Sequence, residues 1–240
     1  MASFILITGP EGAGKTTSIR FLGKYLEKHG YFVLRVYIRS TFFPIRILRK
    51  FLILVGRRQI LCKPDNEKII VPDNEILHKI VNMWYLLDTI IAYVYVFILL
   101  IIIKFLNILR KRIIILAERF LLDTMVDFLY GSLFYKPSKS LTYILVYMLM
   151  KLISYIGLKH SFTTIILDAN YKELLRRYVK RKYSEFLEYV KFQKVMVPKL
   201  LSLINSYNII IASKNIDTSN LNIIETLKRE IKFLYLYKAI

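Results

Sequence analysis

The sequence contains little cysteine, glycine or proline for its 240 residues. Its single cysteine, Cys62, cannot form an intrachain disulfide, and it excludes a metal site built from several cysteines. Eight glycines and six prolines are too few for a collagen or a low-complexity chain, and a hydrophobic content of 55% excludes intrinsic disorder. We therefore expect a single folded domain over residues 1–240.

Acidic residues are also scarce. Seventeen Asp and Glu stand against 37 Lys and Arg, which gives a formal net charge of +20. Such an excess favours an anionic partner. No helix-turn-helix, RNP-type or zinc-finger motif accompanies the charge, so we expect no nucleic-acid binding.

The chain also lacks a long uncharged run. No basic residue precedes the N-terminal apolar run at residues 4–7, which is too short for a signal peptide. The run at residues 89–103 has fifteen uncharged residues, fewer than the roughly 18–20 that a membrane span needs. A second apolar stretch, 141–158, is interrupted by Lys151. We expect a cytoplasmic protein in which these stretches are buried in the core, form a homodimer interface or make peripheral contact with a membrane.

Short apolar runs alternate with helical patterns along the chain. Strands are expected at residues 3–8, 31–38, 113–117, 162–167 and 208–212, and helices at 15–29, 80–109, 120–130, 171–207 and 220–238. This alternation predicts an α/β fold of three layers, in which helices cover both faces of a five-stranded parallel sheet.

A glycine-rich loop follows the first expected strand and opens the first expected helix. Its sequence fits the pattern G-x-x-x-x-G-K-[ST] in full, in the strand-to-helix setting that a phosphate-binding loop requires. Backbone amides of such a loop and the helix N-terminus surround phosphate groups. The loop therefore predicts a P-loop NTPase fold that binds ATP through Gly9, Pro10, Glu11, Gly12, Ala13, Gly14, Lys15, Thr16 and Thr17.

Four residues fit roles in phosphoryl transfer. Lys15 is expected to bridge the β- and γ-phosphates, and the Thr16 hydroxyl to ligate Mg²⁺. A carboxylate at the end of a neighbouring buried strand can hold the same ion through water, and Glu118 follows the strand at 113–117. The guanidinium group of the adjacent Arg119 could donate two parallel hydrogen bonds to an acceptor phosphate. Alternatively, Glu118 and Arg119 have no role in catalysis, and are an acid at the start of a helix and an arginine on the surface.

A basic helix follows the fourth expected strand. Its arginines could stabilise the charge that develops on the transferred phosphoryl group, and Arg177 and Arg181 are the favoured catalytic candidates. The alternative is a solvated basic helix face.

These segments resemble the thymidylate kinase family. Residues 4–17, FILITGPEGAGKTT, are similar to that family's opening strand and loop, where an acid such as Glu11 reaches toward the acceptor sugar. Residues 113–120, IIILAERF, resemble the family's strand followed by Asp-Arg-Tyr, and Glu-Arg also resembles the deoxynucleoside kinases. Residues 165–182 resemble the fourth strand and basic lid, and residues 209–217 the closing strand and loop. The resemblance covers residues 1–38 and 113–237.

The resemblance implies transfer of a phosphoryl group from ATP, with Mg²⁺, to a nucleoside monophosphate, and dTMP is the expected acceptor. The acceptor side departs from the family over about 40–112. The family's Arg-Glu-Pro-Gly-Gly turn is replaced by RSTFFP at 39–44, and no arginine or glutamine occurs at 96–99. Two alternatives therefore stay open. One is a kinase of the same fold for a lipid-linked or sugar phosphate at a membrane surface, and the other is an ATP-binding module without transfer activity.

Overall fold

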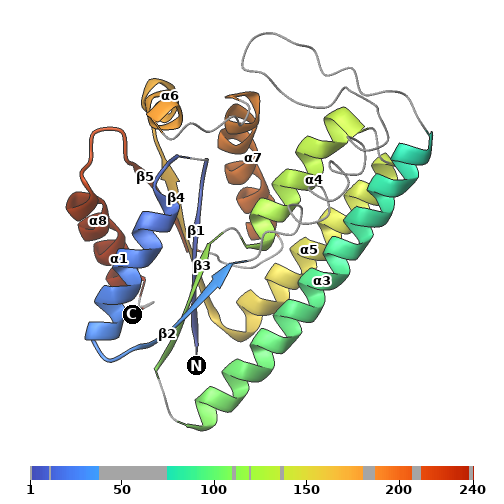
Figure 1. Cartoon of the computed structure of the whole chain (residues 1–240). Helices are drawn as coiled ribbons and strands as arrows, with labels where there is room; N and C mark the ends of the chain where they lie inside the picture. Colours follow the sequence, from blue (N-terminus) through green and yellow to red (C-terminus); the bar gives the residue numbers. More distant parts are fainter. Residues whose placement is uncertain are drawn as a thin grey trace.

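Five parallel strands form the centre of the molecule in the computed structural model (Figure 1). The structure describes residues 2–10, 12–37, 75–109, 112–118, 120–135, 138–180, 187–206, 212–237 and 240. The strands are β1 (Ser3–Thr8), β2 (Phe32–Tyr37), β3 (Ile113–Glu118), β4 (Ser161–Asp168) and β5 (Ala212–Asp217). They lie in the order β2-β3-β1-β4-β5, and this arrangement confirms the expected five-stranded parallel sheet.

β1 lies in the middle of the sheet because β3 and β4 both pair with it along its length. Ser3 is opposite Ile114 of β3 and Ser161 of β4. Near the other end, Ile7 is opposite Glu118. The carboxyl ends of parallel strands meet at one edge of the sheet, so the segments that follow β1, β3, β4 and β5 gather there.

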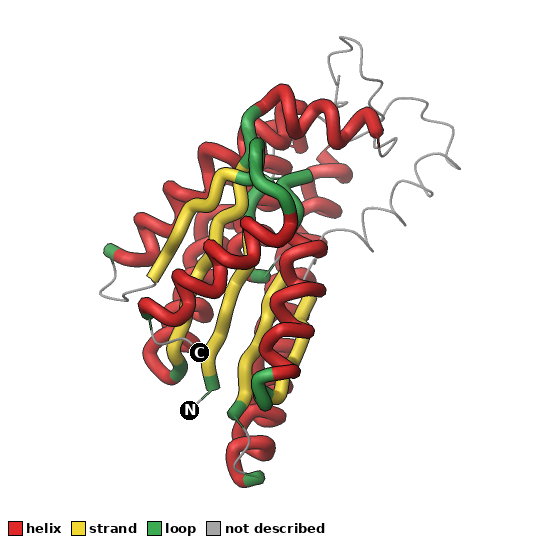
Figure 2. The backbone as a smooth tube through the Cα atoms, turned by 90° about the vertical axis from the view of Figure 1, so that its left-hand side faces the viewer, coloured by secondary structure: helices red, strands yellow, loops and turns green. Residues whose placement is uncertain are grey.

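Helices cover both faces of the sheet and give three layers (Figure 1). One face carries α1 (Lys15–Lys28) and α8 (Ile223–Leu236). The other carries α3 (Glu75–Ile108), α4 (Leu121–Tyr135), α5 (Lys139–Lys159) and α7 (Leu187–Asn205), and α6 (Tyr171–Lys180) lies near the carboxyl edge. Figure 2, turned by 90°, shows the strands lying side by side between the helices.

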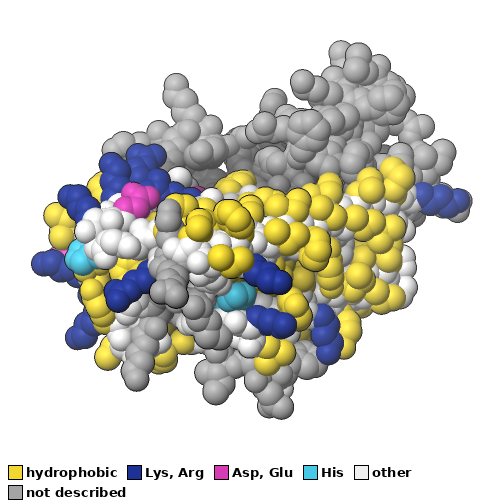
Figure 3. All heavy atoms as spheres, turned by 90° about the horizontal axis from the view of Figure 1, so that it is seen from below, with side chains coloured by type: hydrophobic (Ala, Val, Ile, Leu, Met, Phe, Trp, Pro, Cys, Tyr) yellow, Lys and Arg dark blue, Asp and Glu magenta, His cyan; other side chains and the backbone are white. Residues whose placement is uncertain are grey.

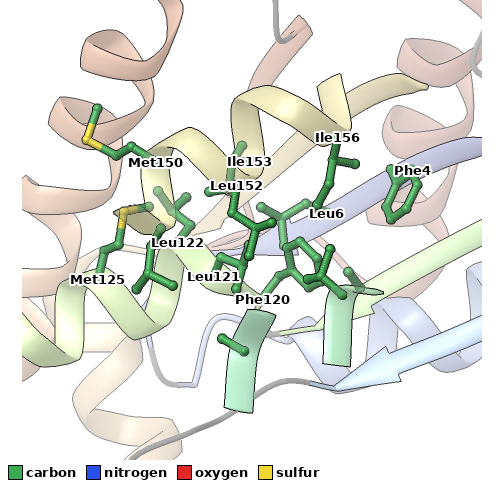
Figure 4. Packing of buried hydrophobic residues seen from close by; sticks show 14 of the residues in the cluster. Phe4, Leu6, Phe120, Leu121, Leu122, Met125, Met150, Leu152, Ile153 and Ile156 are labelled. Atoms are coloured by element: carbon green, nitrogen blue, oxygen red, sulfur yellow. The ribbon is translucent and has the colours of Figure 1, made fainter. Parts of the chain in front are cut away.

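Successive side chains of β1 enter two different hydrophobic cores. Phe4 and Leu6 pack on the side of α4 and α5, as Figure 4 shows, whereas Ile5 and Ile7 pack on the side of α1 and α8. Neighbouring residues of a strand point to opposite faces. A strand buried on both faces therefore needs an uninterrupted apolar sequence, which is what β1 and β3 have.

The fifth strand lies at Ala212–Asp217, so the prediction of residues 208–212 was wrong. β5 is at the edge of the sheet, and Ile216 is its only buried residue. An edge strand of this kind tolerates polar side chains, so its sequence carries no strong hydrophobic signal. The prediction followed the more apolar residues 207–211, which lie outside the described residues. The other four strands are confirmed to within one residue at each end.

The helices differ from expectation mainly in length. The helix expected at 80–109 is α3, which begins at Glu75, and α4 continues through Gly131 to Tyr135. The single helix expected at 171–207 is described as α6 and α7. Within the described part of the chain, α3 over Tyr85–Ile108 and α5 are long and apolar enough to cross a membrane. The core helices of soluble proteins can have the same length and composition.

α8 carries a buried acid, Glu230, on the side that packs against α1. Its side chain is fully buried, and no donor in the described structure satisfies either of its carboxylate oxygens. Burial penalises the charged form and raises the pKa of Glu230 to about 7. The folded protein therefore holds a proton on Glu230 at pH values where the unfolded chain has lost it.

Replacing Glu230 with glutamine is expected to remove a pH-dependent loss of stability. Because the folded pKa is above the unfolded value of 4.5, the free energy of unfolding falls as the pH rises from about 4.5 to about 7. The total loss is about 3 kcal/mol. Urea unfolding at pH 5 and pH 8 should show a smaller decrease for Glu230→Gln than for the parent. Glu188→Gln, an exposed control on α7, should follow the parent. Equal decreases in the parent and in Glu230→Gln would contradict this account.

Candidate active site

The loop between β1 and α1 is shaped by glycines with positive φ. Gly9, Gly12 and Gly14 have φ values of 134°, 82° and 101°. The backbone of β4 also passes close to the loop, since a Cβ atom on Gly9 would lie 1.9 Å from the carbonyl oxygen of Leu167. Only glycine fits at position 9, because any side chain there would collide with backbone atoms. The motif glycines are therefore required by the shape of the loop.

The side chain of Lys15 lies against this loop and is only 4% exposed. Its Nζ atom donates hydrogen bonds to the carbonyl oxygens of Gly9, at 2.7 Å, and Pro10, at 2.9 Å. The ammonium group is thus held beside the N-terminus of α1, where the helix dipole is also positive. Together they favour the binding of an anion such as a phosphate group.

Thr16 and Glu118 are 102 residues apart in sequence and meet at the carboxyl edge of the sheet. Thr16 Oγ1 donates a hydrogen bond of 2.6 Å to Glu118 Oε1. A hydroxyl and a carboxylate oxygen are ligands that Mg²⁺ prefers, and this ion usually keeps several waters and binds through few protein groups. The described residues contain no cluster of three or more His, Cys, Asp or Glu, which would suit a metal held by protein alone. The pair therefore fits Mg²⁺ better than a structural metal.

Asp123 is a second carboxylate at this edge, and it was missed in the sequence. It lies in the first turn of α4, is 4% exposed and accepts a 3.1 Å hydrogen bond at Oδ2 from the Thr8 hydroxyl. Thr8 directly precedes Gly9, so Asp123 lies next to the base of the phosphate loop. An acid in the first turn of a helix is too common a feature to have marked this position.

Arg177 links α6 to the phosphate loop and to the turn after β5. Its guanidinium donates to the Gly12 carbonyl oxygen at 3.1 Å, to the Thr218 carbonyl oxygen at 2.8 Å and to Glu173 at 2.7 Å. Its side chain is 23% exposed, against 78% for the neighbouring Arg176. Hydrogen bonds from Arg176 and Arg177 lower the pKa of Glu173, which keeps this carboxylate ionised. Arg177 is thus a partly buried connector, whereas Arg176 lies on the surface.

Thr218 holds the turn after β5 against the loop. Its backbone N–H and its hydroxyl both donate to the carbonyl oxygen of Asp168 at 2.8 Å, and the hydroxyl lies 3.2 Å from the Ala13 carbonyl oxygen. The sequence did not reveal this residue, because the fifth strand was expected four residues earlier than it occurs.

A hollow opens next to this turn, at the carboxyl ends of β4 and β5. Lys194 and Asp168 form an ion pair of 3.0 Å on its wall. Open parallel sheets bind their ligands beyond the carboxyl ends of the strands, so the hollow is in a suitable place for part of a nucleotide. It is lined by Asp168, Ala169, Asn170, Lys194, Asn215 and Asp217.

The structure brings four of the predicted catalytic and metal-binding residues to one edge of the sheet, beside the phosphate loop: Lys15, Thr16, Glu118 and Arg177. Glu11, Arg119 and Arg181 lie outside the described residues. Most of the divergent acceptor side, residues 38–74, lies outside them as well. The described remainder of that region is mainly α3, which buries two polar side chains, Asp88 and Thr89.

Comparisons with known proteins agree with this architecture. A family model described as an AAA domain matches residues 1–72. No curated protein sequence matches the chain. A deoxyadenosine kinase from M. mycoides, solved with bound dCTP, is 16% identical with a TM-score of 0.56, and the match covers 97% of this chain and 99% of that one. A thymidylate kinase from Candida albicans is 11% identical with a TM-score of 0.53, over 99% and 93% of the two chains. At these identities the likeness shows a shared P-loop fold.

Proposed function

We propose that this protein transfers the γ-phosphoryl group of ATP to a nucleoside monophosphate, with dTMP as the first candidate acceptor. The observation that carries the proposal is the hydrogen bond between Thr16 and Glu118 beside the Lys15 ammonium, at the end of the phosphate loop. Nucleoside and nucleotide kinases share the fold, which supports a reaction of this class.

The donor side of the proposed reaction rests on charge and position. The loop amides and Lys15 would bind the phosphates of ATP, and Thr16 and Glu118 would hold Mg²⁺. The bound ion would neutralise charge on the phosphate oxygens. Catalysis then comes from alignment of donor and acceptor and from stabilisation of the developing charge, without a covalent intermediate.

The arginines divide into separate roles in this proposal. Arg119 is assigned to the acceptor phosphate and Arg181 to the transferred phosphoryl group, and both lie outside the described residues. Arg177 acts at the loop itself, where its bonds to Gly12 and Thr218 keep the phosphate-binding backbone in place.

A second candidate is transfer to a nucleoside that carries no phosphate. Asp123 favours it, because its carboxylate lies at the same edge of the sheet and can accept hydrogen bonds from a sugar hydroxyl or a base amine. The likeness to a deoxyadenosine kinase points in the same direction.

One transfer assay separates the two candidates. The protein is incubated with γ-labelled ATP and Mg²⁺, and with dTMP, dUMP, thymidine or deoxyadenosine as acceptor. We expect labelled dTDP from dTMP. Labelled monophosphates from thymidine or deoxyadenosine alone would favour the second candidate. ATP binding without transfer to any of the four would reject both and direct the search to lipid-linked and sugar phosphates.

A further inference from the structure

α3 has two faces that are both apolar but differ completely in their surroundings. One stripe, which includes Ala92, Val96, Leu99 and Ile103, is at most 5% exposed and packs into the protein core. On the other side, nine large apolar side chains between positions 90 and 108 are 41–70% exposed. They cover about 27 Å of helix at 1.5 Å per residue. An apolar stripe of this length on a protein surface indicates an interaction site.

α5 continues this apolar surface. It lies beside α3, and the Tyr93 hydroxyl of α3 donates a 2.8 Å hydrogen bond to the Met148 carbonyl oxygen of α5. Tyr143, Ile144 and Leu158 of α5 are 54–73% exposed. We call the exposed apolar side chains of α3 and α5 together the α3–α5 face. In Figure 3, hydrophobic side chains cover much of the visible surface on the side where these helices lie.

The exposed charges on the described side chains of α3 and α5 are all of one sign. Among the described side chains of the two helices, the exposed charged residues are lysines, and the acid Asp88 is buried. The lysines are Lys79, Lys104, Lys139, Lys151 and Lys159.

Two of these lysines lie over aromatic rings of α5. Lys151 Nζ is 5.3 Å from the ring centre of Tyr147, and Lys159 Nζ is 5.3 Å from that of Tyr155. Tyrosine and lysine beside exposed apolar side chains suit the boundary between lipid tails and headgroups, where each keeps its polar end in water.

We propose that the α3–α5 face binds the surface of a bilayer that contains anionic lipids. The apolar side chains enter the boundary region, and the lysines contact lipid phosphates. A second copy of this chain suits the face less well. Two chains of charge +20 repel each other, and a self-complementary contact would bring the lysines of one copy against those of the other.

The fold requires α3 to lie along the membrane, since a span is incompatible with it. The buried stripe of α3 packs into the same core as the sheet residues Phe4 and Ile113. β3 begins five residues after α3 ends and pairs with both β1 and β2. A crossing by α3 would separate β3 from the strands with which it pairs, and it would expose the core.

Vesicle cosedimentation of the full chain tests the proposal without reference to any enzymatic activity. We expect at least tenfold stronger binding to vesicles of phosphatidylcholine with 30% phosphatidylserine than to pure phosphatidylcholine, and weaker binding as salt is added. The double variant Phe97→Glu, Phe105→Glu should lose at least tenfold in binding, since both side chains are more than 60% exposed. Its circular dichroism spectrum should match that of the parent.

The matched control places the same two charges on the opposite side of the sheet. Ile224 and Leu236 of α8 are 65% and 70% exposed, and the double variant Ile224→Glu, Leu236→Glu should bind vesicles nearly as well as the parent. Equal losses in both double variants, or no binding by the parent, would overturn the proposal. A different occupant would be indicated if the parent did not bind vesicles but formed a dimer in sedimentation velocity. The proposal would then be overturned if Phe97→Glu, Phe105→Glu dissociated this dimer and Ile224→Glu, Leu236→Glu did not.

Discussion

Lys15→Ala is expected to reduce phosphoryl transfer by about 10²–10³-fold, in line with the removal of one charge-stabilising group from an active site. The ammonium of Lys15 is 4% exposed and lies against the loop, so alanine removes a positive charge from the place where the phosphates bind in the proposed reaction. The measurement is the rate of transfer from γ-labelled ATP at saturating ATP and acceptor.

Two further variants separate the charge of Lys15 from its structural contacts. Lys15→Met keeps most of the aliphatic chain and should lose activity as Lys15→Ala does, while its unfolding midpoint stays closer to that of the parent. Lys24→Ala removes an exposed lysine from the same helix and should leave the rate unchanged. A Lys15→Ala enzyme that keeps more than a tenth of the parental rate would contradict the role given to this residue.

Glu118→Gln is expected to raise the Mg²⁺ concentration for half-maximal activity by about 10–100-fold. Gln can still accept the 2.6 Å hydrogen bond from Thr16, so the local structure should persist while the negative charge is lost. The measurement is a titration of transfer activity with Mg²⁺.

The partner of Glu118 gives an independent check. Thr16→Ser keeps a hydroxyl and should stay near the parental Mg²⁺ curve, whereas Thr16→Val should shift it in the same direction as Glu118→Gln. The exposed control Glu188→Gln should not change the curve. If Glu118→Gln and the parent give the same Mg²⁺ titration, Glu118 has no part in metal binding.

The parts of the fold that sequence could predict are those with strong and local signals. β1, β3 and β4 are short, mainly apolar runs because both of their faces are buried, and the loop after β1 matches a specific motif whose glycines its shape requires. β5 has neither signal, since an edge strand exposes most of its side chains. Its position could be fixed only by its pairing with β4, which depends on the whole fold.

The same distinction applies to the candidate site. The phosphate-loop motif identified Lys15 and Thr16, and a carboxylate after a buried strand identified Glu118. Their contacts follow from the parallel pairing of β1 with β3. Asp123 and Thr218 could not be found in this way, because each is placed by a contact between segments that are distant in sequence. Likewise, spacing identified the basic helix but not the bonds that direct Arg177 to the loop.

The central position of β1 has a consequence for the synthesis of the chain. β1 pairs with β3 and β4, so the middle of the sheet cannot be complete until Ser161, the partner of Ser3 in β4, has been synthesised. At about 5–20 residues per second, the ribosome needs roughly 8–30 s to make the intervening segment. Throughout that interval β1 lacks β4 on one side, and until β3 is made it lacks a partner on the other side as well. We therefore expect nascent chains of this protein to need protection by chaperones and to aggregate when translation stalls before β4.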